Sequence, residues 1–181
     1  MKRFLIVVIA LVLAGGWYAF RPERLFVNQR VDEPLPAATA NENPDAMSAM
    51  TESDAMTSKG DGMSAEPRVV ATGMFHSGTH ETAGTATIHE YADGHRVLRL
   101  TGFHTSNGPD VQVLLVAASD ARDNTTVTRS GYIRLAGLKG NIGDQNYDVP
   151  VGADLSKYRA VTIWCRRFAV NFGTAPLVAH S

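Results

Sequence analysis

The sequence is poor in the residues that carry the commonest covalent and metal chemistry. Its 181 residues include one cysteine, two tryptophans and eight prolines, and 17 Lys and Arg residues nearly balance 18 Asp and Glu residues. A single cysteine excludes an internal disulfide framework and every zinc site built from several thiolates. The formal net charge of -1 gives no bulk attraction to nucleic acid. We therefore predict no nucleic-acid partner.

Catalytic signatures are also missing. The chain has no Gly-rich phosphate loop ending in Lys-Ser or Lys-Thr, no Gly-x-Gly-x-x-Gly and no Gly-x-Ser-x-Gly. One cysteine also excludes a Cys-x-x-Cys redox pair and covalent attachment of a c-type haem. The length suits one folded domain of ordinary size. The sequence therefore contains none of these motifs from which a catalysed reaction could be inferred.

One long apolar run stands at the N-terminus. Lys2 and Arg3 precede an uncharged stretch of 17 residues, from Phe4 to Phe20, and Arg21 follows it. About 17 residues is the lower limit for a membrane-spanning helix, whereas the apolar region of a cleaved signal has about 7 to 15. We predict that residues 1–24 form a signal anchor, a single transmembrane helix in the cell membrane. The positive N-terminal end stays in the cytoplasm, so the rest of the chain is extracytoplasmic, periplasmic or at the cell surface.

Two other interpretations of this run remain. Cleavage after Ala14, Gly15 and Gly16 would instead release a secreted protein. A buried helix of a soluble domain is the third possibility.

The next segment, residues 25–67, has the composition of a disordered linker. Between Val31 and Glu66 there are eight acidic residues, one Lys and no aromatic residue. Such a segment cannot bury enough apolar surface to offset its ordering entropy. Its thioethers are soft ligands that suit Cu(I), although linkers of this kind also occur without a metal. The weak Cu(I) candidates are Met47, Met50, Met56 and Met63.

Residues 68–181 have the pattern of an all-β domain. About seven or eight short apolar stretches alternate with turn residues, and no 3.6-residue period is evident. We predict an antiparallel β-sandwich or small barrel. The expected strands are 71–75, 85–91, 97–103, 111–118, 132–138, 160–165, 169–172 and 177–179. Residues 139–141 and 143–146 are expected to be turns, and 119–131 an irregular loop.

The single cysteine ends an apolar stretch and is followed at once by two arginines. A nearby cation lowers the pKa of a thiol, so Arg166 and Arg167 are candidates to stabilise a Cys165 thiolate. The alternative is a structural role, because free cysteine is among the most buried residue types.

Histidines in the first half of the domain are the remaining candidate ligands. A blue-copper site needs two histidines, one cysteine and a weak axial methionine, which here would be His80, His104, Cys165 and Met74. No histidine follows Cys165 closely, so a compact copper loop is missing. Copper is therefore the less favoured cofactor.

Three separate stretches resemble the DM-thirteen domain family, known as an electron-transfer family. They are Phe103 to Val111, Leu138 to Pro150, and Val161 to Gly173 followed by Ala175-Pro176-Leu177. His80 to Ala86 is similar to the family's opening His-x-x-x-Gly segment. The resemblance covers about residues 68–180 and leaves out the anchor and the linker.

The resemblance implies an exported all-β domain like those that accompany haem-binding redox modules in animals. The family's cysteine corresponds to Cys165, which implies a redox role, either as a bare thiol or as a ligand to a group such as haem. His80 or His104 would then be the second ligand. We predict a membrane-anchored electron-transfer or thiol-redox domain that meets a redox partner protein. The alternative is a non-catalytic binding module in which Cys165 is a buried structural residue.

Overall fold

The computed structural model describes residues 7–9, 11, 12, 15, 18, 27–37 and 66–180. The few described residues of the predicted anchor are helical. Within the described part of the chain, no helix is long and apolar enough to cross a membrane. The four linker methionines, Met47, Met50, Met56 and Met63, lie outside the described residues.

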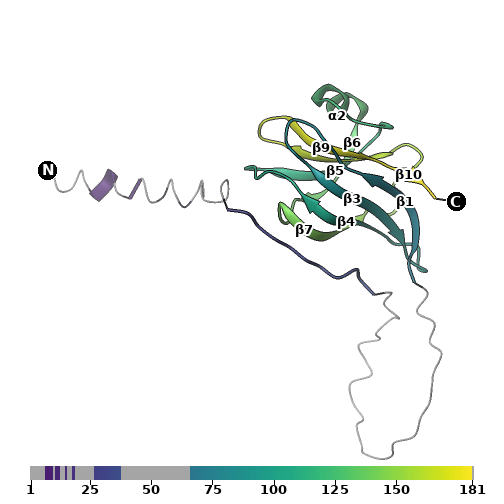
Figure 1. Ribbon diagram of the computed structural model, residues 1–181. Coiled ribbons are helices and arrows are strands. Elements are labelled where there is room, and N and C mark those ends of the chain that lie inside the picture. The colour runs from purple at the N-terminus through teal and green to yellow at the C-terminus, as the bar shows by residue number, and fades with distance from the viewer. Residues whose placement is uncertain are drawn as a thin grey trace, which may run out of the picture.

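Two antiparallel sheets of five strands each pack face to face (Figure 1). The first sheet has the order β10-β1-β3-β4-β7 and the second the order β2-β9-β8-β5-β6. The strands are β1 Arg68–Met74, β2 His76–Ser77, β3 Ala83–Glu90, β4 Arg96–His104, β5 Val111–Val116, β6 Tyr132–Gly137, β7 Ile142–Val149, β8 Ala160–Cys165, β9 Val170–Pro176 and β10 Val178–Ala179. The predicted all-β sandwich is confirmed.

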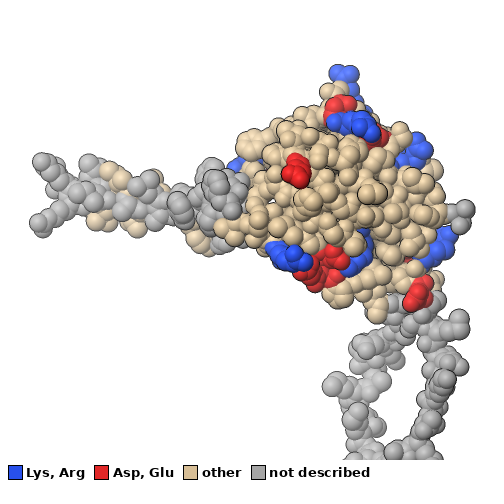
Figure 2. Space-filling view, viewed as in Figure 1, with Lys and Arg blue, Asp and Glu red and all other residues tan. Residues whose placement is uncertain are grey.

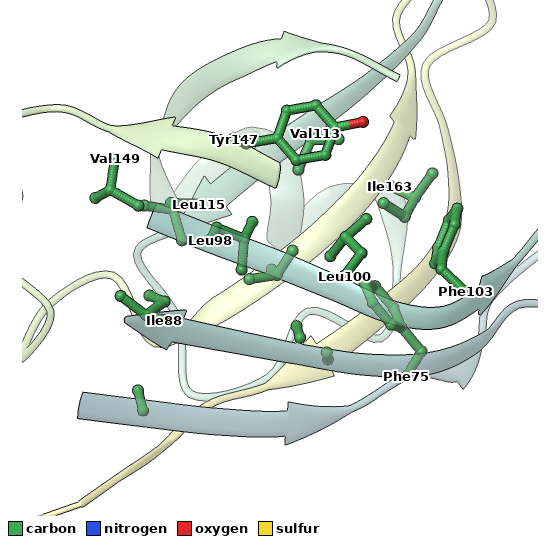
Figure 3. Packing of buried hydrophobic residues seen from close by; sticks show 14 of the residues in the cluster. Phe75, Ile88, Leu98, Leu100, Phe103, Val113, Leu115, Tyr147, Val149 and Ile163 are labelled. Atoms are coloured by element: carbon green, nitrogen blue, oxygen red, sulfur yellow. The ribbon is translucent and has the colours of Figure 1, made fainter. Parts of the chain in front are cut away.

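The core lies between the two sheets and follows from strand alternation. In β4, Leu98 and Leu100 are fully buried, while Arg99 between them points out of the sandwich. Alternate residues of a strand face opposite sides of the sheet, so one face of each strand supplies the core. Figure 3 shows Ile88 and the β4 leucines in the same core cluster as Val113 and Ile163 of the second sheet.

Two central strands of the second sheet are buried on both faces. Every residue of β5 and β8 is buried, because the core covers one face and a helix with its flanking loop covers the other. That helix is α2, Asn124–Ser130, which places Val127 against the sheet. Its N-cap is Asp123, whose carboxylate accepts the Thr126 N–H at 2.8 Å. The predicted irregular loop 119–131 therefore contains a short helix.

The sequence pattern does not predict strand β7. Residues 143–146 have the composition of a turn, yet they lie within β7 and pair with β4. The inward positions include Gln145, which is fully buried because its side chain bonds both the N–H and the carbonyl of Gly140. A strand with a glutamine at a core position lacks the apolar alternation on which the prediction rested.

Residues 28–36, which we call the strap, extend the first sheet beyond β7. The N–H groups of Val31 and Glu33 donate to the carbonyls of Ile142 and Asp144, both at 2.9 Å, in a parallel arrangement. This part of the predicted linker 25–67 is thus an ordered edge of the domain. Figure 1 shows it as the dark-blue extended segment running along the β7 side of the sandwich.

The sequence permits this contact in two ways. A Cβ at Gly140 would lie 2.4 Å from the Gln29 carbonyl oxygen, and one at Gly143 would lie 2.2 Å from that of Val31, so glycine is needed at both positions. Pro34 and Pro36 have no N–H and offer only carbonyls, which accept from Asn146 and from the Tyr91 hydroxyl.

Candidate functional site

Four loops meet at one end of the sandwich, which we call the loop end. They are residues 78–82, 105–110, 138–141 and 166–169. Hydrogen bonds join them directly: the Thr82 and Thr105 hydroxyls are 2.8 Å apart, and the Thr105 N–H donates to the Asn141 carbonyl at 2.8 Å. All the stretches that carry the family resemblance contribute to this end. Segments far apart in the sequence therefore form one structural unit.

Cys165 lies directly beneath the loop end. It is the last residue of β8, opposite Val111 of β5 and Val170 of β9, and none of its surface is exposed. Its side chain belongs to the core between the sheets, whereas Trp164 faces the second cluster under α2. The thiol is free of any disulfide. The structure thus gives Cys165 the buried position that the structural alternative describes.

Arg166 is held by an acidic partner from another loop. Its Nε lies 2.7 Å from Asp110 Oδ2, and its backbone N–H donates to the Asp110 carbonyl at 2.9 Å. Asp110 also accepts from the side chain of Gln112, whose amide oxygen accepts from Arg134 at 2.5 Å. The guanidinium of Arg166 is thus paired with a carboxylate, and its side chain is 69% exposed. Arg167 is exposed on the same turn.

The two candidate histidines flank the loop end at different depths. The His80 ring packs against the Phe172 ring at a tilt of 41°, with centroids 3.9 Å apart, and the His80 backbone N–H donates to the Phe172 carbonyl. Phe172 belongs to the same core cluster as Cys165. His104 is exposed at the end of β4, with Nε2 4.0 Å from Glu81 Oε1.

The residues expected to bind copper are not assembled into a centre. Met74 is 76% exposed at the end of β1, and Cys165 is enclosed in the core. Over residues 27–37 and 66–180, together with the few described N-terminal ones, no three His, Cys, Asp or Glu side chains gather closely enough to hold a metal ion. The set Cys165, His80, His104 and Met74 is therefore scattered across the loop end and the sandwich.

A haem does not fit the surroundings of Cys165 either. An axial ligand has to open onto a space that admits the macrocycle. The sulfur of Cys165 instead lies in a core cluster with Val111 and Phe172, and a Cβ added to Gly108 above them would come within 2.7 Å of Val111 Cγ2 and 3.0 Å of the Phe172 ring. This close packing leaves no room for a planar group beside the thiol.

Close packing continues to the opposite side of the loop end. A Cβ at Gly173 would lie 2.5 Å from the Cβ of Thr82, and the Thr82 hydroxyl donates to the Phe172 carbonyl at 3.0 Å. Asn141 joins the strap to the loops, because its Nδ2 donates to Asn28 Oδ1 at 2.9 Å and to the Thr105 carbonyl at 3.1 Å. Thr82, Asn141 and the strap were not predicted as site residues. Only the glycines that such close approach requires, notably Gly108 and Gly140, mark this arrangement in the sequence.

Comparison with known proteins gives one family. A model described as electron transfer DM13 matches residues 74–177, more than half of the chain. No curated protein and no solved structure matches. The match begins at the end of β1 and includes every loop of the loop end.

Proposed function

Because the chain belongs to the electron-transfer DM13 family, we propose that it is an exported, membrane-anchored electron-transfer domain whose redox function is centred on Cys165. The observation that carries the proposal is the convergence of the family's separated segments on one end of the sandwich, directly above the only thiol in the chain. Residues 1–24 are the anchor in this proposal, and the domain lies outside the cytoplasm.

Burial of the thiol suits an oxidising compartment. An unpaired cysteine there is oxidised or crosslinked unless it is shielded. Cys165 lies in the core cluster with Phe172 and Val111, the His80 ring packs against Phe172, and Gly108 of the 105–110 loop lies close to both Val111 and Phe172. The group is therefore protected from small oxidants in the resting state and reacts with its redox partner only when the loop end rearranges.

The arginine pair has a different role from direct thiolate activation. Arg166 is engaged with Asp110, so it fastens the 166–169 turn to the 105–110 loop. An ion pair that is largely solvent-exposed adds at most about 1 kcal/mol to stability. The Arg166–Asp110 ion pair is therefore weak enough for a docking partner protein to break. In this proposal Arg166 controls access to Cys165 instead of lowering its pKa.

A second candidate function rests on the complete burial of the thiol. The protein is then a non-catalytic binding module, with the loop end as its recognition surface and Cys165 as a core residue. The zero exposure of Cys165 favours this candidate, while the family description favours the first.

One experiment separates the two functions. The full chain is purified from the membranes of an exporting, haem-supplied host, as wild type and as Cys165→Ala. Its absorption spectrum, metal content and thiol state are measured across a series of glutathione redox buffers. A matched control is Val111→Ala, which truncates the strand neighbour of Cys165 but keeps the sulfur.

The electron-transfer proposal expects the Cys165 thiolate to form a mixed disulfide in oxidising buffer, displacing one glutathione from glutathione disulfide, and to be released by glutathione in reducing buffer. Val111→Ala should retain this reversible change and Cys165→Ala should abolish it. A chain that stays colourless, with its thiol reduced at every potential, supports the binding module instead. A Soret band that disappears in Cys165→Ala would contradict the fit argument made above for haem. Recovery of the chain outside the membrane fraction would remove the anchor from the proposal.

A further inference from the structure

We propose that the strap holds the loop end of the sandwich against the membrane, so that the 166–169 turn lies among the lipid headgroups. The partner of this surface is an anionic bilayer. The inference rests on the proposed anchoring by residues 1–24 and adds an orientation to it. It means that the domain meets its redox partner in or beside the same membrane and does not swing on a long linker.

The strap begins at the loop end. Asn28 Oδ1 accepts from Asn107 Nδ2 at 3.1 Å and from Asn141 Nδ2 at 2.9 Å, and the Gln29 N–H donates to Asn141 Oδ1 at 2.7 Å. Only seven residues separate Phe20, where the apolar run stops, from Asn28. The eight residue steps from Phe20 to Asn28 span at most about 29 Å when fully extended. The loop end therefore stays within that distance of the end of the apolar run.

The predicted linker beyond the strap, residues 38–65, does not lie between the apolar run and the domain, so it does not lengthen their connection. The strap ends at Pro36, whose carbonyl accepts from the Tyr91 hydroxyl at 2.6 Å, and β1 begins with Arg68, which pairs with Glu90 at 3.0 Å. Tyr91 and Glu90 are adjacent, at the end of the sandwich away from the loop end. The described residues on the two sides of 38–65 therefore both contact the end of the sandwich away from the loop end. The length of residues 38–65 thus does not set the distance between the domain and the bilayer.

Several contacts along the strap resist its removal. Lys139 Nζ lies 2.7 Å from Glu33 Oε1, the Asn146 N–H donates to Glu33 Oε2 at 2.8 Å, and Arg99 donates to the Glu33 carbonyl at 3.0 Å. Figure 2 shows basic and acidic side chains close together on the part of the surface where β7 and β4 lie in Figure 1. These contacts add to the backbone bonds with β7.

The turn at the loop end has the composition of an interfacial contact. Phe168 is 65% exposed, and it follows Arg166, whose side chain is 69% exposed while it pairs with Asp110, and Arg167. Aromatic and arginine side chains are favoured where an apolar surface meets anionic headgroups. At the opposite end, Val151 is 95% exposed but lies between Asp148 and Asp154, whose charges anionic lipid repels.

Single labels at the two ends test the orientation. The full chain carries Cys165→Ala and either Phe168→Cys or Val151→Cys, each labelled with a fluorophore and reconstituted in vesicles of anionic lipid with a headgroup-attached quencher. Strand β7 has eight residues, and at about 3.3 Å per residue it separates the two ends by roughly 25 Å. We expect severalfold stronger quenching at position 168 than at position 151.

Variants of the strap complete the test. Gly140→Ala places its Cβ against the Gln29 carbonyl, and Glu33→Ala removes the Lys139 pair, so each releases the strap by a different route. Both should bring the quenching at position 168 down towards that at 151. Gly137→Ala is the matched control, because a Cβ there has nothing within 4 Å and the difference should persist.

The outcomes separate this inference from the anchoring on which it rests. If the chain does not float with the vesicles, the anchor fails and so does the orientation. If the chain floats but the two labels are quenched equally, or the Val151→Cys label more, the anchor stands and the orientation is wrong. A difference that survives both strap variants would overturn the role of the strap.

Discussion

The chemical reactivity of Cys165 in the folded protein is the sharpest consequence of the structure. Cys165 has no exposed surface, and β8 lies between β5 and β9 in the middle of its sheet. A reagent can reach the sulfur only after the loop end opens. The rate of alkylation is then the rate for an exposed thiol multiplied by the fraction of molecules that are open.

The opening free energy can be worked from the residues that must move. Exposing the buried side chains of Phe172 and Val111, which share the core cluster with Cys165, costs about 3 to 6 kcal/mol. The Arg166–Asp110 pair adds little, because the arginine is mostly exposed. Disorder gained by the turn offsets part of this cost. Since about 1.4 kcal/mol is a factor of ten, we expect alkylation of the folded protein to be at least about 100-fold slower than of the unfolded chain.

The assay compares alkylation rates at one pH with and without denaturant. An exposed cysteine on the same turn, Phe168→Cys in a Cys165→Ala chain, is the control and should react within about tenfold of the unfolded thiol. Arg166→Ala releases the turn from Asp110 and should speed the labelling of Cys165 severalfold. Native Cys165 that reacts as fast as the control would refute the reasoning, because its sulfur would then be accessible without opening.

Three further predictions concern residues around the site. Burial alone would raise the pKa of Glu33, but hydrogen bonds from Lys139 and from the backbone hold that pKa below the ordinary 4.5. The ionised carboxylate therefore stabilises the strap above pH 4.5, and the strap should lose amide-exchange protection as the pH falls through the lowered pKa. Glu33→Gln should remove this pH dependence. Burial holds the pKa of His89 below 6.5, and the Nδ1 atom of His89 has no hydrogen-bond partner. The folded state therefore favours the neutral imidazole, so the free energy of unfolding measured in urea should fall as the pH drops below 6.5. An unchanged pH profile in His89→Leu would contradict this. Gln145→Ala leaves two backbone groups and the Tyr147 hydroxyl without this partner, which should lower the free energy of unfolding by about 2 to 4 kcal/mol; a loss under 1 kcal/mol in the same urea titration would count against this network.

The strands that the sequence predicted are those with their own apolar content. Residues 97–103 and 160–165 read as strands because branched and aromatic side chains dominate them, and both lie in strands of the sandwich. Strand β7 failed this criterion, since Gln145 occupies a core position and Gly143 allows the strap to approach. Its strand structure comes from pairing with β4 and from hydrogen bonds with a loop, neither of which is local information.

Only some residues of the candidate site were predictable from the sequence, and its geometry was not. Cys165, Arg166 and Arg167 are consecutive in the sequence, so their proximity could be predicted without the tertiary structure. The partner of Arg166 is Asp110, 56 residues away. The pairing of that guanidinium with a carboxylate changed the expected role of Arg166 from thiolate stabilisation to fastening a turn.

The all-β class and the family could be predicted from the sequence alone, because alternating apolar residues, turn residues and three ordered motifs are local properties of the chain. The tertiary structure was needed to show that Cys165 is enclosed, that the His80 ring packs against Phe172, and that residues 28–36 belong to the domain. Burial depends on what the other sheet and the loops place over a residue. The strap forms because β7 is an edge strand with unpaired backbone groups, and because Gly143 and the preceding Gly140 let another segment come close to it.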